Sequence, residues 1–240
     1  MSAFTLFVIL LGVLAGLALL SGLFVAWNMF IPTRGKRIGR YQNPSKALLV
    51  LDIQESSAVT HVATVSLPVG TPFGGMIEAV NRLIECFDCA GQNVAYVRQV
   101  FSNNFITQLH GGRILAGRME PRICRWVKVI NSNDFAKNRT DAFSNRQLEQ
   151  FLIDNQVDEI FLVGLDAAFC VYFTALGALN RGYRVTVVSD AVMTGRDMAQ
   201  VLKRYGKKGI TVTSSRDVIA ALNECSGTKP ATVTVATNHI

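Results

Sequence analysis

The N-terminal end of the chain lacks charge of either sign. No Asp, Glu, Lys, Arg or His occurs between Met1 and Thr33, and Phe4–Ile31 is almost wholly apolar. About 20 such residues are enough to cross a bilayer as a helix. A cleaved signal peptide is the alternative, but such peptides carry a basic leading region and an apolar core of only about 7–15 residues. We therefore expect residues 1–33 to form a transmembrane anchor, with Trp27 at the headgroups near its far end.

The chain also lacks a basic stripe with interleaved aromatic residues, so no nucleic-acid partner is expected. Its net charge of +7 comes partly from a cluster that follows the anchor, namely Arg34, Lys36, Arg37, Arg40 and Lys46. Such a cluster favours anionic lipid headgroups. Under the positive-inside rule it also retains the following domain in the cytoplasm. We interpret residues 34–46 as a basic juxtamembrane linker and predict a single-pass membrane protein whose main domain faces the cytoplasm.

The chain lacks an even number of cysteines, so they cannot all pair within one chain. The five cysteines are Cys86, Cys89, Cys124, Cys170 and Cys225. This composition fits a reducing cytoplasm better than a disulfide framework. The Cys-x-x-Cys motif at Cys86 and Cys89 is compatible with redox or zinc chemistry. It accompanies an apolar helical pattern at about Met76–Phe87, however, and no second metal-type pair follows. We therefore interpret both residues as buried helix cysteines.

Beyond the linker, apolar runs alternate with helical patterns and no internal repeat is present. Runs without strict alternation are typical of strands buried on both faces of a parallel sheet. These runs are Ala47–Ile53, Asn93–Val100, Glu159–Leu165, Tyr183–Ser189 and Gly209–Thr213. The helical candidates are Gly75–Cys89, Asn145–Asn155, Val171–Arg181, Asp197–Tyr205 and Arg216–Leu222. This alternation predicts an α/β fold with a doubly wound, mostly parallel sheet, helices on both faces and ligands at the carboxyl ends of the strands.

Two stretches have no clear periodicity. Residues 101–140 are irregular, and we expect long active-site loops there. The tail from residue 226 to 240 is rich in Thr and Ala and is expected to be flexible. The main domain is therefore assigned to residues 47–225.

Three side chains that can do chemistry lie at or near predicted strand ends. Cys170 opens a helical pattern, and the positive end of a helix dipole lowers a thiol pKa. Asp52 interrupts an apolar run, where a carboxylate could accept the thiol proton. Lys137 lies in the irregular stretch, and its ammonium would stabilise both a thiolate and a carboxylate. Each also has a structural interpretation: a buried filler cysteine, an N-cap and a solvent-exposed lysine.

Three ordered motifs resemble the isochorismatase-like hydrolases. The longest is GLDAAFCVYFTALGALNRGYRVTVVSDAV at Gly164–Val192, with a glycine after a strand, Cys-Val, Thr-Ala one turn on, Gly-Tyr and Asp-Ala. The other two are LVLDIQ, which carries Asp52 and Gln54, and KNRTDAFSNRQLEQFL. In the first and third of these motifs the matching residues are Lys137, Ala142, Phe143, Leu148, Gly164, Cys170, Val171, Thr174, Ala175, Gly182, Tyr183, Asp190 and Ala191. The match spans about residues 45–222.

The resemblance implies a mechanism. In such enzymes a Cys thiolate attacks an amide or related carbonyl, and water then hydrolyses the thioester. It implies that Cys170 is the nucleophile, that Asp52 is the general base and that Lys137 tunes the pair. It further implies an oxyanion hole formed by the backbone N–H groups of Asp166 and Cys170, shaped by a cis peptide between Leu165 and Asp166. Substrate-pocket candidates that accompany these motifs are Gln54, Phe143 and Phe169.

The departures from the family pattern narrow the expectation. Relatives that hydrolyse nicotinamide usually carry a metal-binding Asp-x-His, which does not occur here, and His61 and His110 are isolated. We therefore expect no metal and no cofactor, and nicotinamide is a poor guess. Enzymes that cleave the vinyl ether of isochorismate generally lack the nucleophilic cysteine, so Cys170 favours C–N or other acyl bonds. Substrate choice is expected to depend on loops around 59–73 and 101–122.

The sequence thus predicts a membrane-anchored, metal-independent cysteine hydrolase of small amide-type substrates. The alternative is a catalytically silent, membrane-tethered module that binds a metabolite or a protein. Close helix dimerisation is possible through Gly12 and Gly16, with Ala18 and Gly22 as a second pair of small residues. The resemblance independently implies a homo-oligomer.

Overall fold

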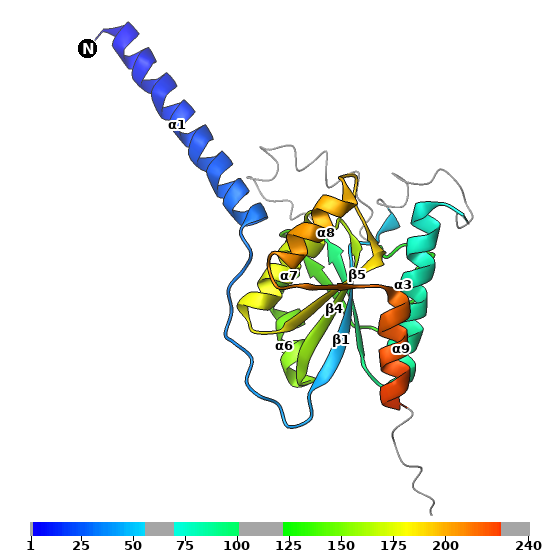
Figure 1. The fold of residues 1–240 in the computed structure, drawn as a ribbon. Coiled ribbons are helices and arrows are strands. Elements are labelled where there is room, and N and C mark those ends of the chain that lie inside the picture. The colour runs from blue at the N-terminus through cyan, green and yellow to red at the C-terminus, as the bar shows by residue number, and fades with distance from the viewer. Residues whose placement is uncertain (1, 56–69, 101–121, 227–240) are drawn as a thin grey trace, which may run out of the picture.

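The computed structural model describes residues 2–55, 70–100 and 122–226 (Figure 1). Most of the two loops expected to govern substrate choice lies outside these residues, as do His61, His110 and nearly all of the C-terminal tail. The described residues contain a six-stranded sheet and helices that cover it.

A parallel sheet of six strands forms the centre of the domain, in the order β3-β2-β1-β4-β5-β6. The strands are β1 (Ser45–Leu51), β2 (Asn93–Gln99), β3 (Asp134–Lys137), β4 (Val157–Leu165), β5 (Arg184–Met193) and β6 (Thr211–Thr213). In the two central strands, β1 and β4, most residues are buried, as expected of apolar runs covered on both faces. The predicted doubly wound parallel sheet is confirmed.

Strand β3 was not predicted, because it lies in the stretch interpreted as loop. It has only four residues and pairs only with β2, at the edge of the sheet. Asp134 and Ala136 are exposed, so the segment has no continuous apolar run that would reveal a strand. Lys137 is consequently the last residue of a strand rather than part of a loop.

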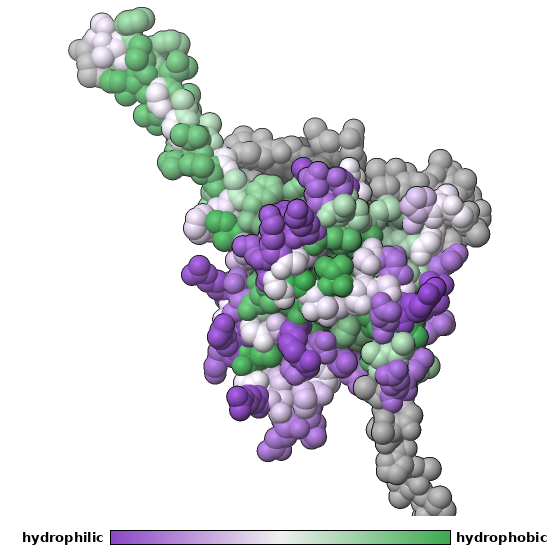
Figure 2. All heavy atoms as spheres, viewed as in Figure 1, coloured by the Kyte–Doolittle hydropathy of each residue, from purple (hydrophilic) through white to green (hydrophobic). Residues whose placement is uncertain are grey.

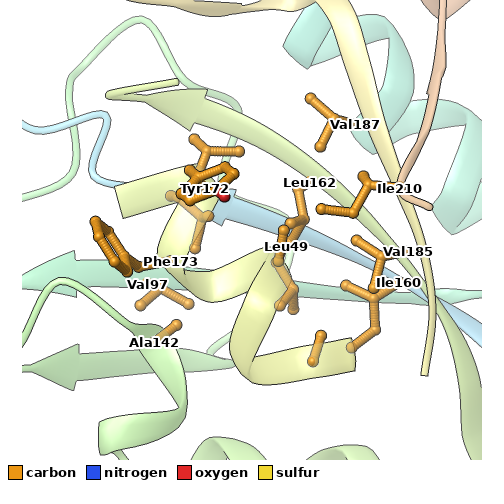
Figure 3. Close-up of a cluster of buried hydrophobic side chains, with 14 of the residues drawn as sticks. Leu49, Val97, Ala142, Ile160, Leu162, Tyr172, Phe173, Val185, Val187 and Ile210 are labelled. Carbon is orange, nitrogen blue, oxygen red and sulfur yellow. The ribbon is translucent and has the colours of Figure 1, made fainter. Parts of the chain in front are cut away.

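Helices cover both faces of the sheet. They are α3 (Pro72–Cys89), α6 (Arg146–Asp154), α7 (Cys170–Asn180), α8 (Met198–Gly206) and α9 (Ser215–Ser226), with a 3₁₀ turn η1 (Ala142–Ser144). Side chains of α6, α7 and α8 pack in one core cluster, and those of α3 and α9 pack in a second cluster on the opposite face. Figure 3 shows part of the first cluster, where Leu49 and Leu162 of the central strands lie near Tyr172 and Phe173 of α7.

Local capping explains where several helices begin. The side chain of Thr71 accepts a hydrogen bond from Gly74 N–H, and Pro72 occupies the first turn of α3. Asn145 caps α6 through Gln147 and Leu148 N–H, and Asp197 caps α8 in the same way. These side chains satisfy donors that every helix N-terminus leaves open.

The interpretation of Cys86 and Cys89 as buried residues is wrong. Both lie on α3 as free cysteines, but Cys86 is only partly buried and Cys89 is exposed. The buried stripe of α3 ends at Phe87, and Cys86 lies toward α9, where its Sγ is 3.8 Å from Asn223 Oδ1. A spacing of three residues places the two cysteines on one side of the helix, next to the apolar stripe rather than within it.

The N-terminal helix α1 (Ala3–Phe30) projects from the domain, and its surface is apolar along its length (Figures 1 and 2). It is long and apolar enough to cross a membrane, a test that a signal sequence near an N-terminus also passes. A Cβ placed on Gly12, Gly16 or Gly22 would meet nothing within 4 Å. Helix dimerisation through these glycines stays a prediction.

Candidate functional site

Asp52, Lys137 and Cys170 meet at the edge where the parallel strands end, which we call the carboxyl edge. Asp52 directly follows β1, Lys137 ends β3, and Cys170 opens α7 after β4. The ammonium Nζ of Lys137 lies 2.8 Å from Asp52 Oδ2 and 3.4 Å from Cys170 Sγ. The Cys170 thiol in turn hydrogen-bonds to the Asp52 carboxylate. Three side chains far apart in the sequence therefore form one closed cluster.

Two of the three residues are almost closed to solvent, and Cys170 is partly exposed. Lys137 is 1% exposed and Asp52 is 6% exposed. Burial alone would lower the pKa of Lys137, but its interactions with Asp52 first and Cys170 next overcome that effect and raise the pKa. The lysine is therefore held as an ammonium beside the carboxylate, which is the partner that a buried charge requires.

The prediction of a lowered pKa for the Cys170 thiol is wrong. Burial, and next the Asp52 carboxylate, raise the pKa of Cys170 to about 12, while Lys137 opposes them. The helix dipole acts only weakly compared with desolvation at this depth. The resting group is thus a neutral thiol next to Asp52, so a thiolate would arise by transfer of the thiol proton within the pair.

Asp52 is held in an unusual backbone conformation. Its φ is 53°, in the left-handed region that Asp tolerates better than most side chains. Its N–H donates to Val97 O at 2.9 Å, and Gln54 N–H donates back to Asp52 O at 3.1 Å. These bonds tie the residue to the end of β2 and turn its carboxylate toward the other two groups of the cluster.

Close contact between β1 and β4 also depends on Gly164. This residue has φ +112°, and a Cβ at its position would lie 2.0 Å from the carbonyl oxygen of Leu51, which precedes Asp52. Any other side chain would push the two strands apart at the point where both enter the site. Gly164, which the motif placed after a strand, lies within β4, and its lack of a side chain has a steric reason.

Gln99 belongs to the site and was missed in the sequence. It ends β2, between the strands that carry Asp52 and Lys137, and its Oε1 accepts a hydrogen bond of 2.7 Å from Lys137 Nζ. Its Nε2 is buried and has no hydrogen-bond partner within the described residues. A polar side chain closing an apolar strand was the available signal, the same signal that identified Asp52.

Gln54 is fully buried and braces the same strand end. Its side-chain amide accepts from Gln99 N–H at 2.8 Å and donates to Gln99 O at 3.2 Å. The amide thus replaces a backbone partner for the last residue of β2. A contact between Gln54 and substrate stays a prediction.

The turn that presents Cys170 is ordered by several bonds. The peptide between Leu165 and Asp166 is cis, as the resemblance implied. Asp166 Oδ1 accepts from Ala168 N–H at 2.7 Å, and Tyr205 OH donates to Ala167 O at 2.6 Å. Among the described residues, the N–H groups of Asp166 and Cys170 donate to no other group. Their role as an oxyanion hole stays a prediction.

The two aromatic pocket candidates differ in position. Phe143 is buried in the core, 5.8 Å from the ring of Tyr183 and 4.6 Å beneath the Arg181 guanidinium. Phe169 is partly exposed next to Cys170, with the Arg196 guanidinium 4.9 Å from its ring. Only Phe169 adjoins the reacting thiol along the chain.

No group of three or more His, Cys, Asp or Glu side chains that could hold a metal ion occurs within residues 2–55, 70–100 and 122–226. All three histidines of the chain lie outside those ranges. The expectation of a metal-free site therefore still rests on the missing Asp-x-His motif.

Comparison with known proteins identifies the family. The isochorismatase domain model matches residues 46–217. The chain belongs to the isochorismatase family. The structure of N-carbamoylsarcosine amidase from Thermoplasma acidophilum superimposes with a TM-score of 0.58 at 26% identity, covering 71% of this chain and 96% of that one.

Curated members of the isochorismatase family align over unequal lengths. The secreted isochorismatase effector Isc1 of Phytophthora sojae is 28% identical over 196 residues, which covers 80% of this chain and 83% of that protein. Nicotinamidase of Escherichia coli is 32% identical over 74 residues, covering 29% of this chain and 35% of that protein. The chain thus spans well under half the length of some of the relatives it matches.

Proposed function

We propose that the chain is a cysteine hydrolase that cleaves an amide or related C–N or acyl bond of a small molecule. The observation that carries this proposal is the closed Asp52–Lys137–Cys170 cluster at the carboxyl edge. Relatives named as an amidase and a nicotinamidase support hydrolysis of a C–N bond. Nicotinamide itself is not proposed, because the Asp-x-His motif is missing.

The chemistry proceeds in two halves. As Cys170 Sγ bonds to the substrate carbonyl carbon, its proton passes to Asp52, and the N–H groups of Asp166 and Cys170 stabilise the developing oxyanion. When the C–N bond breaks, the amine leaves with the proton held by Asp52, and a thioester remains. Water then attacks the thioester, gives a proton to Asp52, and releases the acid. The proton returns to Sγ and restores the thiol.

Lys137 has a supporting role in this scheme. Its ammonium stays 2.8 Å from Asp52 and 3.4 Å from Sγ, so it stabilises whichever of the two carries the negative charge. Transfer of the proton from thiol to carboxylate therefore does not leave an uncompensated charge in a buried site. No step uses a metal or a cofactor.

The proposal includes attachment to a membrane. Helix α1 is long and apolar enough to serve as the anchor. The basic residues that follow it favour a cytoplasmic domain under the positive-inside rule. Assembly into a homo-oligomer is also proposed, on the family resemblance and the small residues of α1.

The test is alkylation with iodoacetamide at pH 6–7, where an ordinary cysteine with a pKa of about 8.5 reacts slowly. The resting thiol has a raised pKa and little free thiolate at this pH. We nevertheless expect Cys170 to be alkylated faster than the exposed Cys89, because Asp52 accepts the thiol proton as Sγ attacks. The adduct is read by peptide mass spectrometry. Asp52→Asn and Lys137→Ala should slow its formation. An amide screen should then give turnover that Cys170→Ala lowers by about 10⁴-fold or more.

The matched control is Cys89→Ala, which makes the same substitution at an exposed cysteine outside the site. It should leave both the Cys170 adduct and the turnover unchanged. Turnover that survives Cys170→Ala would refute the chemistry. Saturable ligand binding with no product, even after long incubation, would favour the silent binding module.

A further inference from the structure

The end of α1 lies against the turn that carries the nucleophile. The ring of Phe30, the last residue of α1, is 6.4 Å from that of Phe169 and 6.1 Å from that of Phe173. Phe169 immediately precedes Cys170, and Phe173 lies one turn further along α7. The apolar helix therefore leaves the domain at the carboxyl edge, next to the candidate site.

The chain directly after α1 is bound firmly to the domain beside α7. The N–H and Oγ1 of Thr33 each donate to Asp141 Oδ2 at 2.7 Å, and Asp141 is only 2% exposed. Arg181 Nη1 donates to Thr33 Oγ1 at 3.1 Å, and Arg139 Nη2 donates to Ile31 O at 2.9 Å. Buried charge-assisted bonds of this kind fix geometry, so α1 is not joined to the domain by a loose tether.

The linker then travels the full height of the domain before β1 begins. Figure 1 shows it running from the end of α1 down the side of the domain to the opposite edge of the sheet, where Ser45 starts β1. Ile38 N–H donates to Arg181 O on the way. A direct connection would have left the anchor at the edge where the strands start. The detour instead turns the carboxyl edge, with its cysteine, toward the side from which α1 extends.

The surroundings of the α1 end match the chemistry of a bilayer interface. A cavity of about 590 Å³ at the end of α1 is lined by Trp27 and Ile31, by Glu149, which pairs with Arg181, and by four arginines, namely Arg34, Arg139, Arg146 and Arg181. Tryptophan and arginine are the residues that membrane interfaces favour. Near Cys170, Arg196 covers Phe169, so a further cation lies at this level.

From this arrangement we propose that the carboxyl edge faces the bilayer and that the site acts on amphiphiles. The apolar chain of such a substrate stays in the membrane, while its amide-type carbonyl reaches Cys170 past Phe30 and Phe169. This inference rests on the proposed function, because it names the substrate class of the same cysteine. A substrate that partitions into the bilayer also gives the anchor a chemical purpose, since the enzyme and its substrate then meet in two dimensions.

The experiment compares two reagents that carry the same reactive group. The full chain is reconstituted in phosphatidylcholine–phosphatidylglycerol vesicles and treated with water-soluble iodoacetamide or with membrane-partitioned N-hexadecyl iodoacetamide. Peptide mass spectrometry gives the ratio of adducts on Cys170 and Cys89. Cys89 is an exposed internal reference at the end of α3, where the chain turns toward the start of β2. We expect the hexadecyl reagent to raise this ratio by about tenfold or more, because its chain concentrates it at the bilayer.

Two insertions of a flexible Gly-Ser segment form a matched pair. Insertion between Ile31 and Pro32 separates α1 from the docked linker, and the raised ratio should fall to the value found with iodoacetamide. The same insertion between Gln42 and Asn43, which are exposed, leaves the docking intact and should preserve the raised ratio. Labelling of Cys170 by iodoacetamide with the parent protein's preference over Cys89 reports that each variant is folded.

The outcomes separate the two proposals. Fast, Asp52-dependent labelling of Cys170 by iodoacetamide with no preference for the hexadecyl reagent overturns the membrane-facing site and leaves the hydrolase intact. A raised ratio that persists after insertion at Ile31 also overturns it, since the docked linker would then not set the orientation. Failure of both reagents at Cys170 overturns the proposed function and this inference together.

Discussion

Lys137 and Gln99 end neighbouring strands, and the ammonium of Lys137 donates to Gln99 Oε1 at 2.7 Å. Gln99 thereby supplies the lysine with a third neighbour besides Asp52 and Cys170, and it does so without adding charge. The bond fixes the direction in which the ammonium points. Gln99 is accordingly a positioning residue, acting through Lys137.

Gln99→Leu should weaken the site without abolishing it. The substitution keeps the volume but removes an acceptor from a buried ammonium, which costs about 1–3 kcal/mol of folding free energy. We expect a lower thermal midpoint and slower alkylation of Cys170 at pH 6–7. Gln99→Glu restores an acceptor and should recover part of the alkylation rate, whereas a purely structural role would predict no such recovery.

Removal of one partner of the buried ion pair should be severe. Lys137→Met leaves the Asp52 carboxylate without its cation and should cost about 3–5 kcal/mol of folding free energy. The double variant Lys137→Met, Asp52→Asn should be less destabilised than the sum of the single variants. Denaturant titration of all four proteins in detergent micelles measures this coupling, and additive losses would mean that the pair contributes little.

Gly164→Ala should disrupt the joint between β1 and β4. A Cβ there meets Leu51 O at 2.0 Å, and the alanine must adopt a φ of +112°. The two penalties together are expected to cost about 2–5 kcal/mol of folding free energy. Gly195→Ala is the matched control, because a Cβ at that position meets nothing within 4 Å. The control should stay within about 0.5 kcal/mol of the parent protein. Equal midpoints for the two variants would contradict the steric role.

Stability should fall at alkaline pH because of Cys170. Burial and the Asp52 carboxylate raise the pKa of the thiol to about 12 in the folded chain, compared with about 8.5 in an unfolded one. The native state then binds the extra proton, so the stabilisation is complete below about pH 8.5 and is lost as the pH rises to 12. The slope in this window is at most about 1.4 kcal/mol per pH unit.

The measurement is the thermal midpoint of the parent protein and of Cys170→Ala at pH 7.5 and pH 10.5. The parent protein should lose more stability between the two pH values than the variant does. Parallel losses would show that other alkaline groups, such as the buried tyrosines, account for the whole effect.

Metal removal should leave the reaction unchanged. The proposed steps use only Asp52, Lys137, Cys170 and two backbone donors, and the sequence contains no Asp-x-His motif. Dialysis against a chelator should therefore preserve both the Cys170 adduct and turnover. Loss of activity that zinc or another divalent ion restores would contradict the metal-free proposal.

The sequence was a good guide to the layers of the fold and a poorer guide to electrostatics. The buried strands β1 and β4 were visible because central parallel strands form continuous apolar runs. The short edge strand β3 was not visible in the sequence, so only the structure reveals that Lys137 lies at the end of a strand. The thiol pKa was expected to move in the wrong direction, since burial and the Asp52 contact arise only when residues 118 positions apart meet in the fold.

Gln99 and the docked linker escaped prediction for the same reason. A glutamine after an apolar strand indicates a site only once its neighbours are known, and Gln99 lies beside Lys137 through strand pairing alone. Thr33 contacts Asp141, which follows 108 residues later, so nothing local distinguishes it from a solvated linker residue. Partners at such separations are set by the tertiary fold.

The hydrogen bonds of Thr33 impose an order on the folding of the protein during its synthesis. Its partner Arg181 is 148 residues further along the chain, so a ribosome has released the linker long before the groups that hold it exist. Contacts of this separation close large loops and form late. Helix α1 thus leaves the ribosome while the domain is still an unfinished chain, and the linker can dock only after α7 has formed. The domain would then fold while already attached to α1, and the last contacts to form would be those that set the orientation of the domain relative to α1.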